Sequence, residues 1–128
     1  MYILTVEDDI AIRESIREIL ESVGYLVETA CNGQEALDVL HCKTKPSLIL
    51  LDLMMPVMNG WQFIDEVIKD ESLSTVPIII ISAVTFQGVL GDKPNIIKVI
   101  KKPVSIEQLL RVVKEVCGNP IKQNRVEP

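Results

Sequence analysis

The chain has 128 residues, of which 48% are hydrophobic and 24% charged, and its formal net charge is -5. This length suits one domain, and this composition is typical of a globular protein rather than a disordered one. The acidic balance argues against a nucleic-acid-binding surface, and no apolar run is long enough to cross a bilayer. We therefore expect a soluble single domain, a monomer or weak dimer, that binds neither nucleic acid nor membrane.

The N-terminus and the cysteines bear on cellular location. Met1 and Tyr2 lead directly into an apolar run without a basic segment or cleavage site, so we predict no secretory signal. The three cysteines, Cys31, Cys42 and Cys117, show no CxxC spacing, which favours reduced thiols. These features predict a cytoplasmic protein.

The first half of the chain alternates between the periods of strands and helices. Residues 2–6 form an apolar run of strand length, and residues 25–30 form a second. Between them one helical face is apolar, and its members are Ile12, Ile16, Ile19, Leu20 and Val23. Gly24 is expected to end this helix, and Asn32 with Glu35 resembles a capping box that begins a second one.

The second half continues the alternation. Further strands are predicted over residues 47–51, 76–81 and 96–100, and Asn59 with Gly60 is expected to begin a helix after the first of these. Residues 84–95 contain two glycines and a proline, so they predict only a short fourth helix. A last helix should run from Ser105 to Gly118, with an apolar face of Ile106, Leu109, Leu110, Val113 and Val116.

This order of elements predicts the fold class. Strands that are aliphatic on both faces, each followed by a helix, indicate an α/β protein with a parallel sheet covered on both sides. Residues 1–117 form the predicted domain, and residues 118–128 form a polar tail.

Chemically active side chains follow four of the five predicted strands. They are Glu7, Asp8 and Asp9 after the first strand, Asp52 after the third, Ser82 after the fourth, and Lys101 and Lys102 after the fifth. Because parallel strands end at the same edge of a sheet, these groups should converge where open α/β sheets bind their ligands.

Each of these residues also has a purely structural explanation. Asp52 could cap the turn that leads to Pro56, and Asp9 could cap the first helix. Ser82 could begin a turn, and Lys102 could be a solvated loop cation. The functional interpretation depends on their occurring together.

The predicted cluster of carboxylates indicates a bound cation. Asp52 follows four aliphatic residues, and an ionised group in apolar surroundings needs a partner. Clustered carboxylates repel one another unless a cation lies among them, and oxygen ligands suit Mg²⁺, Mn²⁺ or Ca²⁺. A site with few carboxylates, open to water and phosphate, fits Mg²⁺ best. His41, expected at the surface, and the cysteines have no zinc-ligand spacing.

Four ordered motifs resemble the signature of response-regulator receiver domains. They are "VEDD" after the first strand, "LLDLMMPVMNG" around Asp52, "ISA" after the fourth strand and "KKP" after the fifth. The resemblance covers about residues 1–117. It implies a flavodoxin-like three-layer sandwich with strand order 2-1-3-4-5, an arrangement for which a receiver protein is a standard illustration.

The resemblance also implies roles for individual residues. Asp52 is the implied phosphoacceptor, Ser82 the switch hydroxyl and Lys102 the phosphate-binding lysine. The backbone amide of Ala83 is expected to contact the phosphate, and the Lys102–Pro103 bond is expected to be cis. The implied Mg²⁺ site, which Mn²⁺ could also occupy, comprises Glu7, Asp8, Asp52 and the backbone carbonyl of Met54.

By the same resemblance, the domain belongs to a two-component or phosphorelay pathway. A histidine kinase or phosphotransfer protein would phosphorylate Asp52, and a change in a partner-binding surface would follow. The protein is not expected to be an enzyme beyond catalysing its own phosphorylation and slow dephosphorylation. The cognate kinase and the downstream target cannot be read from the sequence.

Two departures from the family pattern affect these expectations. Relatives usually carry an aromatic residue three positions before the lysine, where this chain has Val99, so we expect activation to act mainly through the loop after Ser82. Met54 and Val84 occupy positions that flank the path of attacking water in receivers generally. Because neither side chain can orient water, we expect a long-lived phosphorylated state.

Three other interpretations remain open from the sequence. The chain could be a pseudo-receiver that binds proteins without phosphorylation, although the set Asp8, Asp52, Ser82 and Lys102 argues against this. A flavin or nucleotide carrier is less favoured because the chain lacks a glycine-rich phosphate loop. The chain could also be the N-terminal receiver of a longer DNA-binding regulator or hybrid kinase; the polar tail favours a stand-alone receiver.

Overall fold

The computed structural model describes residues 1–83 and 95–119. Over these residues strands and helices follow one another in the predicted order. The elements are β1 (Ile3–Val6), α1 (Ile10–Ser22), β2 (Val27–Ala30), α2 (Gly33–Cys42), β3 (Leu48–Leu51), α3 (Gly60–Lys69), β4 (Ile78–Ser82), β5 (Ile96–Lys101) and α4 (Ile106–Cys117). The fourth helix predicted within residues 84–95 lies, except for Asn95, outside the described residues, as do positions 120–128 of the tail.

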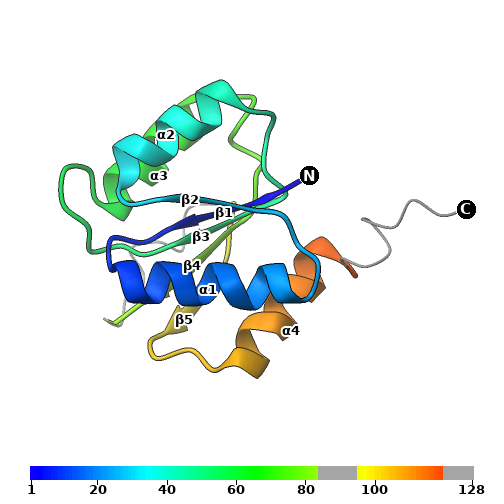
Figure 1. The fold of residues 1–128 in the computed structure, drawn as a ribbon. Helices are drawn as coiled ribbons and strands as arrows, with labels where there is room; N and C mark the ends of the chain where they lie inside the picture. Colours follow the sequence, from blue (N-terminus) through cyan, green and yellow to red (C-terminus); the bar gives the residue numbers. More distant parts are fainter. Residues whose placement is uncertain (84–94, 120–128) are drawn as a thin grey trace, which may run out of the picture.

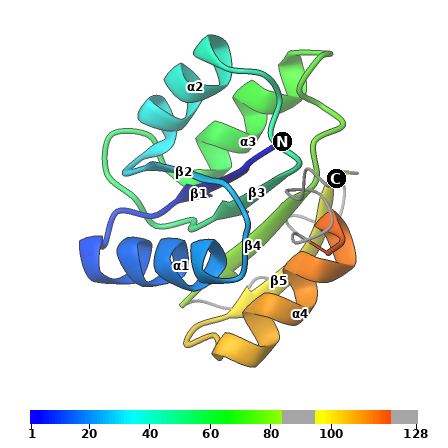
Figure 2. The same ribbon diagram turned by 45° about the vertical axis from the view of Figure 1, so that its right-hand side comes forward.

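The described strands form one parallel sheet of order β2-β1-β3-β4-β5, which confirms the predicted order. Helices α2 and α3 lie on one face of the sheet, and α1 and α4 lie on the other (Figure 1). The same three layers are visible when the molecule is turned (Figure 2). This flavodoxin-like arrangement brings the carboxyl ends of the strands to one edge.

Alternate residues of the central strands belong to two separate cores. The core beneath α2 and α3 contains Leu4 and Val6 of β1, and the core beneath α1 and α4 contains Ile3. Strands β1, β3 and β4 are buried at every position. This double burial explains why their sequences are aliphatic except at Thr5 and Ser82, as expected for a parallel sheet covered on both faces. β5 lies at the sheet edge, where Ile97, Lys98 and Val99 are exposed.

Side chains at the predicted positions cap the helices. Asp9 caps α1 by accepting a hydrogen bond from the amide of Ile12, and Asn59 with Gln62 forms a complete capping box at α3. At α2, Asn32 accepts from the amide of Glu35 as predicted. The Glu35 carboxylate, however, accepts from the amide of Cys31, so the reciprocal bond of a standard capping box is displaced by one residue.

The predicted apolar face of α4 needs one correction. Ile106 was expected to be buried, but 57% of it is exposed, whereas Val112 is buried instead. Leu109 and Val113 are buried as predicted, so the buried stripe follows positions i, i+3 and i+4 from Leu109. Ile106 is the first residue of the helix, one turn before this stripe, and it borders a hollow between the helix and α1 rather than packing into the core.

Candidate functional site

The residues predicted to converge do so at the carboxyl edge of the sheet. Glu7 and Asp8 follow β1, Asp52 follows β3, Ser82 ends β4 and Lys102 follows β5. One carboxylate oxygen from each of Glu7, Asp8 and Asp52 lies within 4.8 Å of the others. The Lys102 ammonium reaches both Glu7 and Asp52. Residues separated by up to 95 positions along the chain thus form one cluster.

Asp52 is buried at the end of β3, with 5% of its surface exposed. Its Oδ1 atom lies 3.5 Å from Lys102 Nζ, and its carboxylate also accepts a hydrogen bond from the Met54 amide. Burial raises the pKa of the Asp52 carboxyl and nearby Asp8 raises it further, although Lys102 and the Met54 amide oppose this. Asp52 therefore caps its own turn and also faces the cluster, so the two interpretations of this residue are compatible.

Glu7 and Lys102 form the shortest ion pair of the cluster. Glu7 Oε1 lies 2.7 Å from Lys102 Nζ, and Glu7 Oε2 accepts a hydrogen bond from the Asp9 amide at 3.2 Å. Burial raises the pKa of Glu7 despite both hydrogen bonds. Burial lowers the pKa of Lys102, but its bond to Glu7 and the charges of Glu7 and Asp52 outweigh this and raise it. Both oxygens of Glu7 are thus engaged by donors from the chain itself.

Asp8 differs from the other two acids because it is exposed. Within residues 1–83 and 95–119, no hydrogen bond or ion pair involves its side chain. Two of the three clustered carboxyls, those of Glu7 and Asp52, have raised pKa values. Among the described residues, Lys102 is the one cation that pairs with them. Oxygen donors with incomplete charge compensation suit a hard divalent cation, so the residues present fit Mg²⁺.

The remaining predicted residues surround this cluster. Ser82 is fully buried at the end of β4, and its carbonyl accepts a hydrogen bond from the Lys102 amide at 2.8 Å. Ala83 follows it and is exposed. The side chain of Met54 is 57% exposed beside Asp52. The Lys102–Pro103 peptide bond is cis, as expected.

Two residues that the sequence analysis did not assign to the site also shape it: Arg13, and Gly60, which was predicted only to begin a helix. Arg13 Nη1 donates a hydrogen bond to the carbonyl oxygen of Glu7 at 2.9 Å. Gly60 lies so close to the turn after β3 that a β-carbon there would be 2.9 Å from the Asp52 carbonyl oxygen. For the contact between Arg13 and Glu7, the sequence offers only a weak signal: the two residues are six positions apart, on either side of a helix start.

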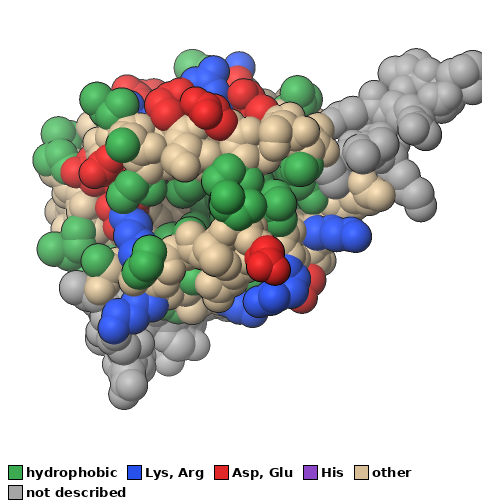
Figure 3. All heavy atoms as spheres, turned by 60° about the horizontal axis from the view of Figure 1, so that its bottom comes forward, with side chains coloured by type: hydrophobic (Ala, Val, Ile, Leu, Met, Phe, Trp, Pro, Cys, Tyr) green, Lys and Arg blue, Asp and Glu red, His purple; other side chains and the backbone are tan. Residues whose placement is uncertain are grey.

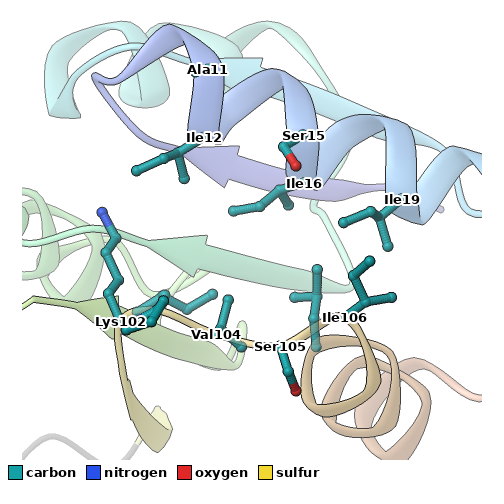
Figure 4. A pocket seen from close by; sticks show the side chains of 12 residues that line it. Ala11, Ile12, Ser15, Ile16, Ile19, Lys102, Val104, Ser105 and Ile106 are labelled. Carbon is teal, nitrogen blue, oxygen red and sulfur yellow. The ribbon is translucent and has the colours of Figure 1, made fainter.

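A hollow of about 350 Å³ opens beside the cluster, between α1 and the segment that joins β5 to α4. It is lined mainly by aliphatic side chains, among them Ile12, Ile16, Val104 and Ile106. Hydrophobic side chains gather across the middle of this side of the molecule, with charged side chains around them (Figure 3). Lys102 lies at one end of the hollow, and its ammonium points toward the start of α1 (Figure 4).

Comparisons with known proteins agree with this geometry. The response regulator receiver domain family matches residues 3–114. A CpxR homolog from Haemophilus influenzae, a transcriptional regulatory protein, is 36% identical over 116 residues, which cover 89% of this chain and 49% of that protein. The chain spans about a third to just over half of the length of curated relatives that it matches.

Solved structures of receivers are similar as well. The chemotaxis protein CheY4 of Vibrio cholerae has a TM-score of 0.80 and 30% identity, over 90% of this chain and 97% of that one. The receiver domain of a sensor histidine kinase from Pseudomonas aeruginosa, solved with a magnesium ion coordinated in its active-site cleft, has a TM-score of 0.80 and 28% identity. That likeness covers 91% of this chain and 97% of the other.

The chain therefore belongs to the response regulator receiver domain family and is a receiver domain of two-component signalling. Receiver domains are signalling domains that bind Mg²⁺ at an acidic pocket and interact with histidine kinases or phosphotransfer proteins, and this chain has an acidic cluster at the corresponding edge. None of the helices in the described ranges is long and apolar enough to span a membrane.

Proposed function

We propose that Asp52 accepts a phosphoryl group from a phosphohistidine of a kinase or phosphotransfer protein. The observation that carries this proposal is a buried carboxylate, Asp52, within 3.5 Å of a lysine ammonium and close to the exposed acid Asp8. In the proposed step an oxygen of Asp52 forms a bond to phosphorus while the bond between phosphorus and the histidine nitrogen breaks. The electron pair of the broken bond stays on that nitrogen, and the donor imidazole, protonated at its other ring nitrogen, leaves as the neutral ring.

The side chains around Asp52 would each have a defined part in this step. Lys102 would offset negative charge on the transferring oxygens, and Glu7 would keep the Lys102 ammonium at the cluster. The Ser82 hydroxyl and the Ala83 amide would bind oxygens of the product phosphate. Binding of these two groups to the phosphate would then change a surface that a partner protein recognises.

The proposed metal site comprises Asp8, Asp52 and the backbone carbonyl of Met54, with Glu7 at its margin. A Mg²⁺ or Mn²⁺ ion bound there would supply further positive charge to the transferring oxygens. Asp8 is suited to direct ligation because it is exposed and makes no described side-chain hydrogen bond. Both oxygens of Glu7 already accept hydrogen bonds, so we place Glu7 beside the ion rather than among its closest ligands.

Labelling from a small phosphodonor such as acetyl phosphate tests the assignment. The parent protein should be labelled in the presence of Mg²⁺ and not after chelation, and Asp52→Asn should abolish the label. Asp38→Asn changes an exposed acid on α2 and serves as the matched control. A label that persists in Asp52→Asn would refute the assignment, whereas a complete lack of labelling in the parent would favour the pseudo-receiver alternative.

We further propose that the phosphohistidine donor docks over the aliphatic hollow between α1 and α4. The hollow ends at Lys102, so a protein seated there could present a histidine to Asp52. Ile106→Glu should slow transfer from the fastest donor in a panel of phosphorylated phosphotransfer proteins without slowing acetyl phosphate labelling. Ile97→Glu changes a similarly exposed isoleucine on β5 outside the hollow and should leave both rates unchanged. Equal slowing by both variants would contradict this docking site.

The wider biological setting is also a proposal. We infer a cytoplasmic receiver of residues 1–117 that catalyses only its own phosphorylation and slow dephosphorylation. One arrangement to be tested is a stand-alone receiver. Relatives named as transcriptional regulators support the alternative that this receiver precedes an output domain. Sequencing the complete gene and mass analysis of the native protein would distinguish these two arrangements.

A further inference from the structure

The two arginines at the start of α1 make different contacts. Arg13 is half-buried and turns back along the chain, so that its Nη1 atom donates to the Glu7 carbonyl oxygen at 2.9 Å. Arg17 lies one turn later and instead faces Glu14 and Glu21 on the helix surface, at 3.7 Å and 3.6 Å. Only Arg13, of this pair, reaches the segment that carries the acidic residues of the site.

Several hydrogen bonds fix the backbone on either side of Asp8. The Glu7 amide donates to the Ala30 carbonyl at 3.0 Å, which continues the pairing of β1 with β2. The Asp9 amide donates to Glu7 Oε2, and Asp9 Oδ1 accepts from the Ile12 amide. The side chain of Asp8 itself makes no hydrogen bond within the described ranges, so the position of its carboxylate depends on the backbone around it.

The hydrogen bond from Arg13 acts at the first peptide group of the segment between β1 and α1. The carbonyl of Glu7 belongs to the peptide that connects Glu7 to Asp8, so its orientation sets the direction in which Asp8 leaves the strand. Arg13 extends from a helix whose start is itself capped by Asp9, and a charged donor makes a strong hydrogen bond to a carbonyl. Its rigid planar head fixes a direction as well as a distance.

We propose that Arg13 is a positioning residue for the metal site, which holds the Glu7–Asp8 peptide so that the Asp8 carboxylate faces Asp52. This inference rests on the proposed function, because it takes Asp8 and Asp52 as ligands of the divalent ion. Arg13 touches neither the ion nor the phosphate. It acts by preorganising an exposed ligand that no side-chain contact of its own holds in place.

The test is the affinity for Mg²⁺ of the complete chain, measured by titration calorimetry without any phosphodonor. Arg13→Met keeps an unbranched apolar stem but removes every donor, and it should raise the Mg²⁺ dissociation constant about tenfold. Arg13→Lys keeps a charged donor and should stay within about threefold of the parent. Arg17→Met is the matched control, since Arg17 lies on the same helix outside the site, and it should not change the affinity.

A second readout separates positioning from a general loss of structure. In Arg13→Met the Mg²⁺ concentration that gives half-maximal acetyl phosphate labelling should rise about tenfold, while the rate at saturating Mg²⁺ stays near that of the parent. A merely destabilised protein would instead show a lower maximal rate with unchanged half-saturation. That outcome, or an unchanged dissociation constant in Arg13→Met, would overturn the inference.

Two further outcomes remain informative. If Arg13→Met fails to fold, Arg13→Gln, which is too short to span the same distance but remains polar, should show the same loss of affinity; unchanged affinity in this variant would overturn the inference. If Asp52→Asn is still labelled while Arg13→Met weakens Mg²⁺ binding, the phosphoacceptor assignment fails and the role of Arg13 stands.

Discussion

Gly60 is the position where a single methyl group should perturb both stability and the candidate phosphoacceptor. It is buried at the first position of α3, and its amide donates to the Leu53 carbonyl at 2.9 Å. In Gly60→Ala the new β-carbon would lie 2.7 Å from both Cα and Cδ2 of Leu53 and 2.9 Å from the Asp52 carbonyl oxygen. Because Leu53 is fully buried and one of its two atoms belongs to the backbone, the turn that follows Asp52 must move.

The size of the effect follows from these distances. Ordinary contact begins at 3.4 Å, so the turn must open by about 0.7 Å. Overpacking of this kind costs about 1 to 3 kcal/mol, and weakening the bond to Leu53 adds about 1 kcal/mol. Alanine is favoured over glycine within a helix by about 1 kcal/mol, which offsets part of the cost. The net loss is about 2 kcal/mol, or about 7 °C in Tm for a chain of this length.

Thermal unfolding and acetyl phosphate labelling measure the two consequences. Gly60→Ala should lower Tm and also slow labelling at saturating Mg²⁺, because Asp52 is displaced with its turn. Gly33→Ala is the comparison. Its β-carbon would lie 2.7 Å from Cγ and 2.8 Å from the carbonyl oxygen of Met58. Met58 is half-buried and lies farther from Asp52 along the loop between β3 and α3. Gly33→Ala should slow labelling less. If Tm and the labelling rate were unchanged in Gly60→Ala, the turn after Asp52 would accommodate the methyl group without loss, and this prediction would be refuted.

Two further predictions concern Asp52 directly. In the metal-free protein the pKa values of Glu7 and Asp52 are raised above 4.5 and 3.8, so the folded state holds their protons more tightly than the unfolded state does. The protonated carboxyls therefore contribute to the free energy of unfolding fully below their unfolded-state pKa values, and this contribution is lost as pH rises through the raised folded-state pKa values. Asp52→Asn lacks the Asp52 part of this loss, so between pH 4 and 7 its free energy of unfolding should rise relative to that of the parent by on the order of 1 kcal/mol, measured by denaturant unfolding in the presence of a chelator. A stability difference that does not change with pH would contradict this. Met54→Asn should shorten the lifetime of the phosphorylated protein severalfold, measured as loss of label after donor removal, and an unchanged lifetime would show that Met54 does not limit water access; its proposed counterpart, Val84, lies outside the described residues.

The sequence by itself determined the architecture. The strands of the sheet centre are aliphatic at all positions except Thr5 and Ser82 because both faces are covered, and this pattern distinguishes a parallel α/β sheet from a sheet with one solvent-exposed face. The sequence also identified the helix starts, since Asp9, Asn59 and Ser105 each accept a hydrogen bond from the amide three residues later. The candidates Glu7, Asp8, Asp52, Ser82 and Lys102 followed from one further rule, that parallel strands end at a common edge. Met54, Ala83 and the roles of all these residues were implied by the family resemblance.

The tertiary structure decided which partner each site residue takes. Glu7 and Asp8 are neighbours in the chain, yet Glu7 is buried against Lys102 while Asp8 is exposed. Burial of Ile106 was wrongly predicted because helical periodicity does not reveal that the first turn of α4 borders a hollow rather than the core. The contact of Gly60 depends on how closely two backbones approach, and that of Arg13 depends on its side chain folding back to the Glu7 carbonyl; no pattern of residue types encodes either geometry. Local patterns reflect interactions within a few residues, whereas the charge balance of the site depends on contacts across as many as 95.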